Sequence, residues 1–169
     1  MEGLFNGGGT YQYNVFGGLT VGAGLKYSYF NINTFALNNA AISGGLHMPA
    51  VYGKLGYERF TTDRVSFTPS VRAGYAMNIS ANDSCKIKLD GPYTVGSWFV
   101  EPQIEMVLLT EKASPNGFSL VLGYAFYGFE FGPEFICTDV IPNSVPEHYE
   151  GISRFFTIGF GYRYYMGRK

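Results

Sequence analysis

The sequence predicts an all-β protein, an antiparallel up-and-down transmembrane β-barrel in which seven strands are legible and an eighth would complete the barrel. Seven segments of the 169-residue chain alternate apolar residues with polar or small ones, as half-buried strands do. The composition includes 23 Gly, 15 Phe and 14 Tyr, whereas charged residues reach only 15%. A helical membrane span is excluded, because no apolar run approaches about 18 residues.

The first three strands are expected at residues 4–15, 19–29 and 47–59. In the first, tyrosines alternate with polar residues. In the second, leucine, valine and tyrosine alternate with glycine, lysine and small polar residues. The third alternates less regularly, but its apolar side chains share one face, opposite Lys54 and Glu58.

Four more strands are expected at residues 65–80, 98–110, 118–126 and 154–166. The strand at 65–80 shows the alternation most clearly, with valine, phenylalanine and tyrosine on one face and serine, threonine and glycine on the other. This strand, of roughly 16 residues, is far longer than the usual soluble strand of about 5–6 residues.

The expected connections alternate in length, which predicts an up-and-down meander with all long loops at one end. The short connections are residues 16–18, 61–64 and 111–117, and the long ones are roughly 33–45, 81–97 and 132–153. No linker or low-complexity segment interrupts the pattern, so residues 1–169 are expected to form one domain.

The glycines indicate which face of the sheet points inward. Most lie on the polar face, where small residues fit the cramped interior of a small barrel. They are Gly22, Gly24, Gly74, Gly123, Gly159 and Gly161. The same face carries four cations and three anions, which we expect to pair in the lumen as a structural charge network. These are Lys26, Lys54, Glu58, Arg72, Glu101, Glu105 and Arg163.

The opposite face carries almost no charge and is rich in tyrosine near the strand ends. Such a face suits lipid contact flanked by aromatic girdles, as in outer-membrane barrels. The alternative is a soluble, lipocalin-like barrel, in which the apolar face would point inward.

The expected orientation places the long loops outside the cell and the C-terminus in the periplasm of a bacterial outer membrane. Seven strands then put Met1 on the extracellular side, although such barrels have an even strand count. No signal peptide is legible at residues 1–3. We therefore expect that an upstream first strand is missing; the alternative is that another chain completes the sheet.

Several motifs resemble the small outer-membrane β-barrel proteins of Bacteroidetes, a porin-like family. They are a Pro-led strand at residues 47–55, the sequence Arg-Ala-Gly-Tyr at 72–75, Val-Gly-Ala-Gly at 21–24 and the aromatic closing strand at 159–164. The resemblance covers roughly residues 10–166. It implies an outer-membrane location and no generally assigned activity, so no catalytic residue is carried over. The chain departs from the family in its missing first strand and in its last four residues, which follow the final aromatic.

Two carboxylates, Glu101 and Glu105, share the inward face, and Arg72 lies on the preceding strand. One hypothesis is a selectivity site in a narrow pore, or a carboxylate pair for acid–base chemistry. The other, which we favour, is a buried ion network that fills the lumen, because unpaired buried charge is costly.

Histidine and cysteine offer little further chemistry. Neither His47 nor His148 has the spacing of a metal site with a cysteine, so no metal or other cofactor is expected. His148, together with Glu150 and Ser153, has the residue types of a hydrolase triad such as a lipid A deacylase would need, but all three fall in a predicted loop. The two cysteines fall in long loops at the same end, where either a disulfide or two free thiols would fit; they are Cys85 and Cys137.

The net charge of −1 excludes a strongly basic nucleic-acid-binding surface. We expect a non-enzymatic integral outer-membrane protein with a structural or accessory role through its extracellular loops. Its expected partners are membrane lipid, lipopolysaccharide and a larger outer-membrane protein complex. A narrow pore with a charged lumen and a lipid-modifying enzyme are the alternatives.

Overall fold

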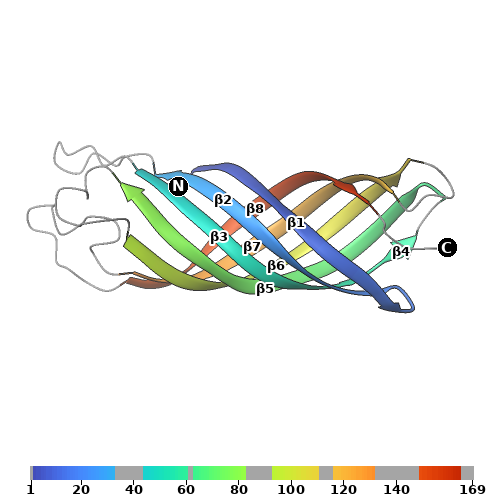
Figure 1. Cartoon of the computed structure of the whole chain (residues 1–169), viewed down its shortest axis with the longest axis horizontal. Coiled ribbons are helices and arrows are strands. Elements are labelled where there is room, and N and C mark those ends of the chain that lie inside the picture. Colours follow the sequence, from blue (N-terminus) through green and yellow to red (C-terminus); the bar gives the residue numbers. More distant parts are fainter. Residues whose placement is uncertain are drawn as a thin grey trace, which may run out of the picture.

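The computed structural model describes residues 2–32, 44–60, 63–82, 93–110, 116–131 and 149–164. Its strands are β1 Glu2–Phe16, β2 Leu19–Ile32, β3 Gly44–Tyr57, β4 Arg59–Phe60, β5 Val65–Asn82, β6 Tyr93–Leu109, β7 Gly117–Phe131 and β8 Tyr149–Arg163. Seven of them form an antiparallel up-and-down sheet in the order β1-β2-β3-β5-β6-β7-β8, and the two-residue β4 pairs with β5 (Figure 1). In the ranges given above, no helix is long and apolar enough to cross a membrane.

All seven expected strands are present, but several extend further than their hydrophobic alternation. Strand β6 begins at Tyr93 rather than at residue 98, and β7 runs to Phe131 rather than to 126. Strand β8 begins at Tyr149 rather than at 154. Thr94 and its neighbours at the start of β6 show no clear alternation of apolar and polar residues. They nevertheless pair with β5 in the same register as the rest of the strand. Cross-strand pairing therefore extends the strands where the residue pattern is weak.

The sheet is strongly curled, and its strands run obliquely to the long axis of the molecule (Figure 1). Side chains on its concave face reach strands that are not their neighbours. Lys26 on β2 contacts Glu101 on β6 at 2.8 Å, and the rings of Phe30 on β2 and Phe155 on β8 lie 4.8 Å apart. The two edge strands, β1 and β8, do not pair with each other within the described residues, so the sheet is not closed there.

Polar and apolar side chains are distributed between the two faces of the sheet in the reverse of the way expected for a soluble protein. Buried polar or charged side chains on the concave face include Lys26, Lys54, Glu101 and Glu105. The convex face exposes large apolar side chains from every long strand, from Tyr11 on β1 onward. The predicted assignment of the glycine- and charge-bearing face to the interior is confirmed by this burial pattern.

Two different kinds of connection join the strands. At one end, β1 and β2 are joined by a two-residue turn in which Gly17 and Gly18 have φ angles of 56° and 92°. Only glycine adopts such angles readily, and this turn suits the twist of a hairpin. At the other end Ile32 pairs with Gly44, and the segments joining β2–β3, β5–β6 and β7–β8 lie outside the described residues.

A proline divides what the sequence predicts as one strand, 47–59, into β3 and β4. Pairing of β3 with β5 stops at Gly56 and Ser70, and pairing of β4 with β5 resumes at Arg59 and Phe67 in the same register. Pro69 stands in the gap. Because proline has no N–H group, it cannot donate the ladder hydrogen bond at this position.

Two more prolines coincide with similar gaps in central ladders. Pro49 lies where the β3–β5 ladder is interrupted, and Pro102 lies where the β6–β7 ladder is interrupted. In both places the register is the same on either side of the gap. The curled sheet therefore tolerates three missing donors without a slip of the strands.

We predict that Gly74→Ala lowers the free energy of unfolding by about 1–3 kcal/mol, because overpacking forces backbone shifts. A Cβ at Gly74 would collide with the carbonyl oxygen of Val51 and with Tyr52. The matched control is Gly53→Ala, since a Cβ there meets nothing closer than 3.9 Å. Denaturant unfolding followed through Trp98, the only tryptophan, measures both, and equal midpoints would contradict the prediction.

Candidate functional site

The structure brings all seven charged residues of the predicted lumen network onto the concave face. They come from strands far apart in the sheet, because the curl turns the polar side of each strand toward a common interior. The members are Lys26, Lys54, Glu58, Arg72, Glu101, Glu105 and Arg163. This network is the candidate functional site.

The first part of the network is centred on Glu101 of β6. Its Oε2 atom accepts a hydrogen bond from Lys26 Nζ at 2.8 Å, and its Oε1 atom accepts one from Thr157 Oγ1 at 2.8 Å. The Lys26 ammonium also lies 5.6 Å from the centre of the Phe99 ring and 5.9 Å from that of Tyr127. These contacts compensate for the burial of both charges, which would otherwise be costly.

The second part is centred on Glu105, four residues after Glu101 on the same face of β6. Its Oε2 atom is 2.9 Å from Lys54 Nζ and 3.1 Å from Arg163 Nη2. Arg163 also contacts Glu58 Oε1 through Nη1 at 2.6 Å, and Lys54 donates to Gln12 Oε1 at 3.0 Å. Strands β1, β3, β6 and β8 are thus connected through one set of side chains.

Arg72 on β5 is the least satisfied member. Its Nη1 atom is 4.0 Å from Glu101 Oε2, at the limit of an ion pair, and its Nε atom has no hydrogen-bond partner among the described residues. Its guanidinium lies 5.1 Å from the centre of the Tyr52 ring. The seven side chains together carry one more positive charge than negative charge. Among the described residues, Arg72 is the cation of this network whose nearest carboxylate oxygen is as far as 4.0 Å.

Aromatic side chains fill the interior next to the ions. The rings of Phe99 and Tyr127 stack at 5.2 Å, and Tyr127 meets Phe155 edge-on at 5.8 Å. Tyr52 lies edge-on to Phe99 at 6.3 Å, and its hydroxyl is 2.5 Å from Thr10 Oγ1. The interior positions of Tyr52 and Tyr127 were not predicted from the sequence. The signal that could have placed them there is their spacing of two residues from Lys54 and Ala125.

Within the network, ion pairs hold each of the three carboxylates, Glu58, Glu101 and Glu105, against a cation. Both Glu101 and Glu105 are held by cations, as the ion-network hypothesis expects. No group of three or more His, Cys, Asp or Glu side chains in the part of the chain that the structure describes is arranged to hold a metal ion. The charge network and the aromatic rings together fill the concave side of the sheet.

The remaining candidate residues are scattered. His47 lies on the convex face, where its Nδ1 atom is 2.5 Å from Tyr27 Oη. Cys85, Cys137 and His148 lie outside the described residues, as does the side chain of Glu150. The expectation that Glu150 and Ser153 belong to a loop is wrong, because both lie in β8, where pairing with β7 extends the strand.

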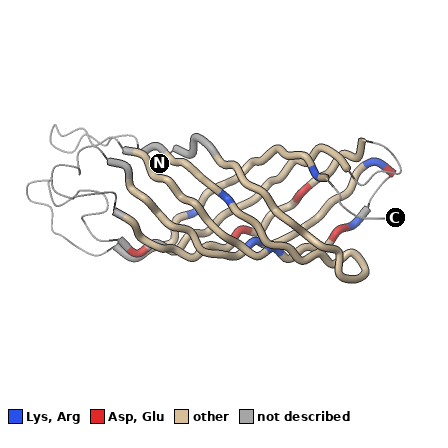
Figure 2. Tube along the Cα trace, in the orientation of Figure 1, with Lys and Arg blue, Asp and Glu red and all other residues tan. Residues whose placement is uncertain are grey.

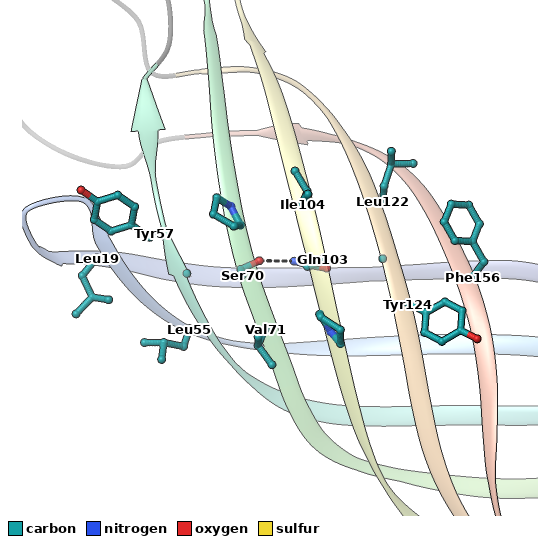
Figure 3. Close-up of a pocket in the computed structure, with 14 residues that line it drawn as sticks. Leu19, Leu55, Tyr57, Ser70, Val71, Gln103, Ile104, Leu122, Tyr124 and Phe156 are labelled. Carbon is teal, nitrogen blue, oxygen red and sulfur yellow. Dashed lines mark hydrogen bonds between the residues drawn. The ribbon is translucent and has the colours of Figure 1, made fainter.

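The convex face has a shallow apolar depression of about 770 Å³. Figure 3 shows its labelled side chains, which belong to β2, β3, β5, β6, β7 and β8. Pro69 and Pro102, at two of the ladder gaps, contribute to its lining. The Ser70–Gln103 hydrogen bond of 2.9 Å drawn there belongs to the buried face beneath.

We predict that Glu101→Gln lowers the free energy of unfolding by about 3–5 kcal/mol, because Lys26 stays buried without its carboxylate. The control is Glu130→Gln, an exposed position on β7, which should change stability by less than about 0.5 kcal/mol. The double variant Lys26→Met, Glu101→Leu should recover part of the loss, since neither buried charge of the pair then remains. A double variant less stable than the single one would contradict this account.

Comparison of the chain with protein-family models, with curated proteins and with solved structures found no match in any of the three. The resemblance to small Bacteroidetes outer-membrane barrels therefore stays a prediction from the sequence.

Proposed function

We propose that the chain is a non-enzymatic integral protein of a bacterial outer membrane, built as an eight-stranded β-barrel of which it supplies seven strands. The observation that carries the proposal is the inverted distribution of side chains. The convex face exposes apolar residues on every long strand, while charged residues are buried on the concave face. In water this arrangement would leave the apolar area unburied, whereas in a bilayer it meets lipid.

The length of the apolar surface supports the same proposal. On β7 the outward side chains run from Phe118 through Leu122 to Phe126 before Glu130 introduces a charge. This stretch is long enough to cross the hydrocarbon, for which a strand needs about 9–11 residues. Figure 2 shows how few charged positions occur along the strands. Exposed tyrosines near strand ends, such as Tyr57 and Tyr162, suit the interfacial girdles.

In this proposal the end with the long connections faces outside and the C-terminus lies in the periplasm. The partners are membrane lipid and lipopolysaccharide around the convex face, and a larger outer-membrane complex is the further partner class. The role is structural or accessory, exerted through the extracellular loops. A filled interior supports this, because the ion network and the aromatic rings occupy the space that a channel would need.

A narrow pore with a charged lumen is the second candidate. It is favoured by the charge on the concave face, where Glu101 and Glu105 follow each other along β6. Rings of carboxylates serve as selectivity filters in cation channels. Against it stands the pairing of both carboxylates with lysine or arginine at 2.8–3.1 Å.

We predict that Ile104→Arg impairs insertion into lipid bilayers, with a cost of about 2–4 kcal/mol near the bilayer midplane. The control is Thr94→Arg, an exposed position on the same face of β6 but close to its end, where the cost falls to about 0–1 kcal/mol. Refolding into detergent micelles and then vesicles, read as heat-modifiable migration on a gel, measures both. A wild-type chain that is stable and monomeric without detergent would favour the soluble barrel instead.

We predict no steady large conductance when the protein is reconstituted into planar bilayers, because the interior of a small barrel is filled by side chains. Single-channel recording tests this. If a steady current does appear, Glu101→Gln and Glu105→Gln should alter its cation selectivity, and the pore would then replace the structural role.

A further inference from the structure

Arg154 of β8 places a positive charge on the mostly apolar convex face. Its side chain is exposed, as are its neighbours on the same face of the strand, Ile152 and Phe156. Among the described side chains, the other lysines and arginines lie in the interior network or, like Arg59 and Arg64, at the end of the sheet with the short connections. No ion pair among the described residues involves Arg154. An anion from outside the sheet can therefore pair with it.

The position of Arg154 marks a boundary of the apolar surface. It follows Tyr149, where β8 begins at the end with the long connections, by five residues. From Phe156 to Tyr164 the outward side chains of this strand are exposed and uncharged. That stretch is close to the length that crosses the hydrocarbon, for which a strand needs about 9–11 residues. In the proposed orientation Arg154 lies at the level of the outer-leaflet headgroups, where the cost of a charge is small.

Trp98 of β6 lies at the same depth from this end and covers a glycine of the next strand. Like Arg154, it follows the first residue of its strand by five positions. A Cβ on Gly128 of β7 would collide with the indole, so the ring lies over this position, while 49% of Trp98 stays exposed. Tyr75, directly opposite Trp98 on β5, covers Gly96 in the same way. The sheet therefore covers one side of the indole and leaves the other side open.

The pairing of β7 with β8 places Arg154 beside the indole. Gly128 pairs with Ile152, and Phe126 pairs with Arg154. Gly128 and Arg154 are thus diagonal neighbours on one face, a relation that separates two positions by about 7–8 Å and lets long side chains meet. A guanidinium and the open side of an indole are therefore adjacent at one depth of the convex face.

These two groups fit a phosphorylated sugar. A guanidinium binds phosphate oxygens through two parallel N–H donors. The open side of the indole offers a large apolar surface on which the C–H face of a sugar ring can pack. A phospholipid with a glycerol headgroup supplies the phosphate but no ring for the indole, and a hydrocarbon chain supplies neither.

We propose that Arg154 and Trp98 form a binding site for the phosphorylated sugar headgroup of a glycolipid in the outer leaflet. The phosphate binds Arg154, and a sugar ring packs on Trp98. Lipopolysaccharide has a headgroup of this chemistry. The site rests on the proposed function, because the membrane location and its orientation bring this end of the convex face to the outer leaflet.

The first test uses Trp98 as the reporter, since it is the only tryptophan of the chain. The protein is refolded in uncharged detergent micelles with a chelator, so that no divalent cation bridges a phosphate to Glu130 nearby on β7. Diphosphoryl lipid A is titrated while the Trp98 emission is recorded, and a saturable change is expected. Binding should be at least about tenfold weaker for phosphatidylglycerol, which has no sugar, and for lipid A without its phosphates. Equal affinity for the first would overturn the sugar contact, and equal affinity for the second would overturn the phosphate contact.

The second test changes the arginine. Arg154→Met should weaken the binding of diphosphoryl lipid A at least about tenfold, because a charge-assisted contact is lost, and Arg154→Lys should retain part of the affinity. The matched control is Arg59→Met, an exposed arginine of the convex face at the opposite end, which should bind as the wild type does. An equal loss in both methionine variants would mean attraction by net charge without a site, and would overturn the proposal.

The indole is tested with Trp98→Leu and fluorescently labelled diphosphoryl lipid A, whose retention by the protein is measured by gel filtration in detergent. Retention should fall relative to the wild type, and unchanged retention would overturn the packing of a sugar on Trp98. Folding of every variant is checked by heat-modifiable migration without lipid. Wild-type protein that inserts into micelles and vesicles but shows no saturable binding would overturn the site alone. Wild-type protein that does not insert would overturn the proposed function, and the site with it.

Discussion

Pairing of buried charges across the concave interior is the interaction on which the rest of this structure depends. Glu101 and Glu105 each bind a lysine from a strand that is not their neighbour in the sheet. Charges of this kind are tolerated in a low-dielectric interior only when they are compensated by partners at hydrogen-bond distance. The sheet must therefore curl far enough for β2 and β3 to face β6, and that curl gives the molecule its two chemically opposite faces.

The second constraint is the backbone hydrogen bond. Central ladders lose a donor at Pro49, Pro69 and Pro102, yet the strands keep their register on both sides of each gap. The long antiparallel pairings on either side hold the strands in place. At the outer edges of β1 and β8 the situation differs, because neither edge is paired within the described residues. These two strands run in the same direction, since direction alternates along the seven-strand path.

The proposal of a membrane protein with a structural role is supported by both faces of the sheet. The convex face exposes apolar side chains on every long strand, and the concave face is occupied by paired ions and stacked rings. Under the proposed function, the role would be exerted at the ends, where the long connections leave the sheet. The contacts between the interior charges agree with a filled interior rather than an open channel in the proposed barrel.

The sequence by itself determined the existence of the seven strands, their up-and-down order and, where the alternation is clear, the face that a side chain takes, because a period of two residues is a local property of extended chain. It also identified the seven interior charges, since their parity places them with the glycines. Only the tertiary structure decided which charges meet, for example that Lys26 binds Glu101 whereas Arg72, directly opposite Glu101 in the register, stays at 4.0 Å. Those contacts depend on how far the sheet curls and how its strands are staggered, and both are properties of the whole sheet that no single strand encodes.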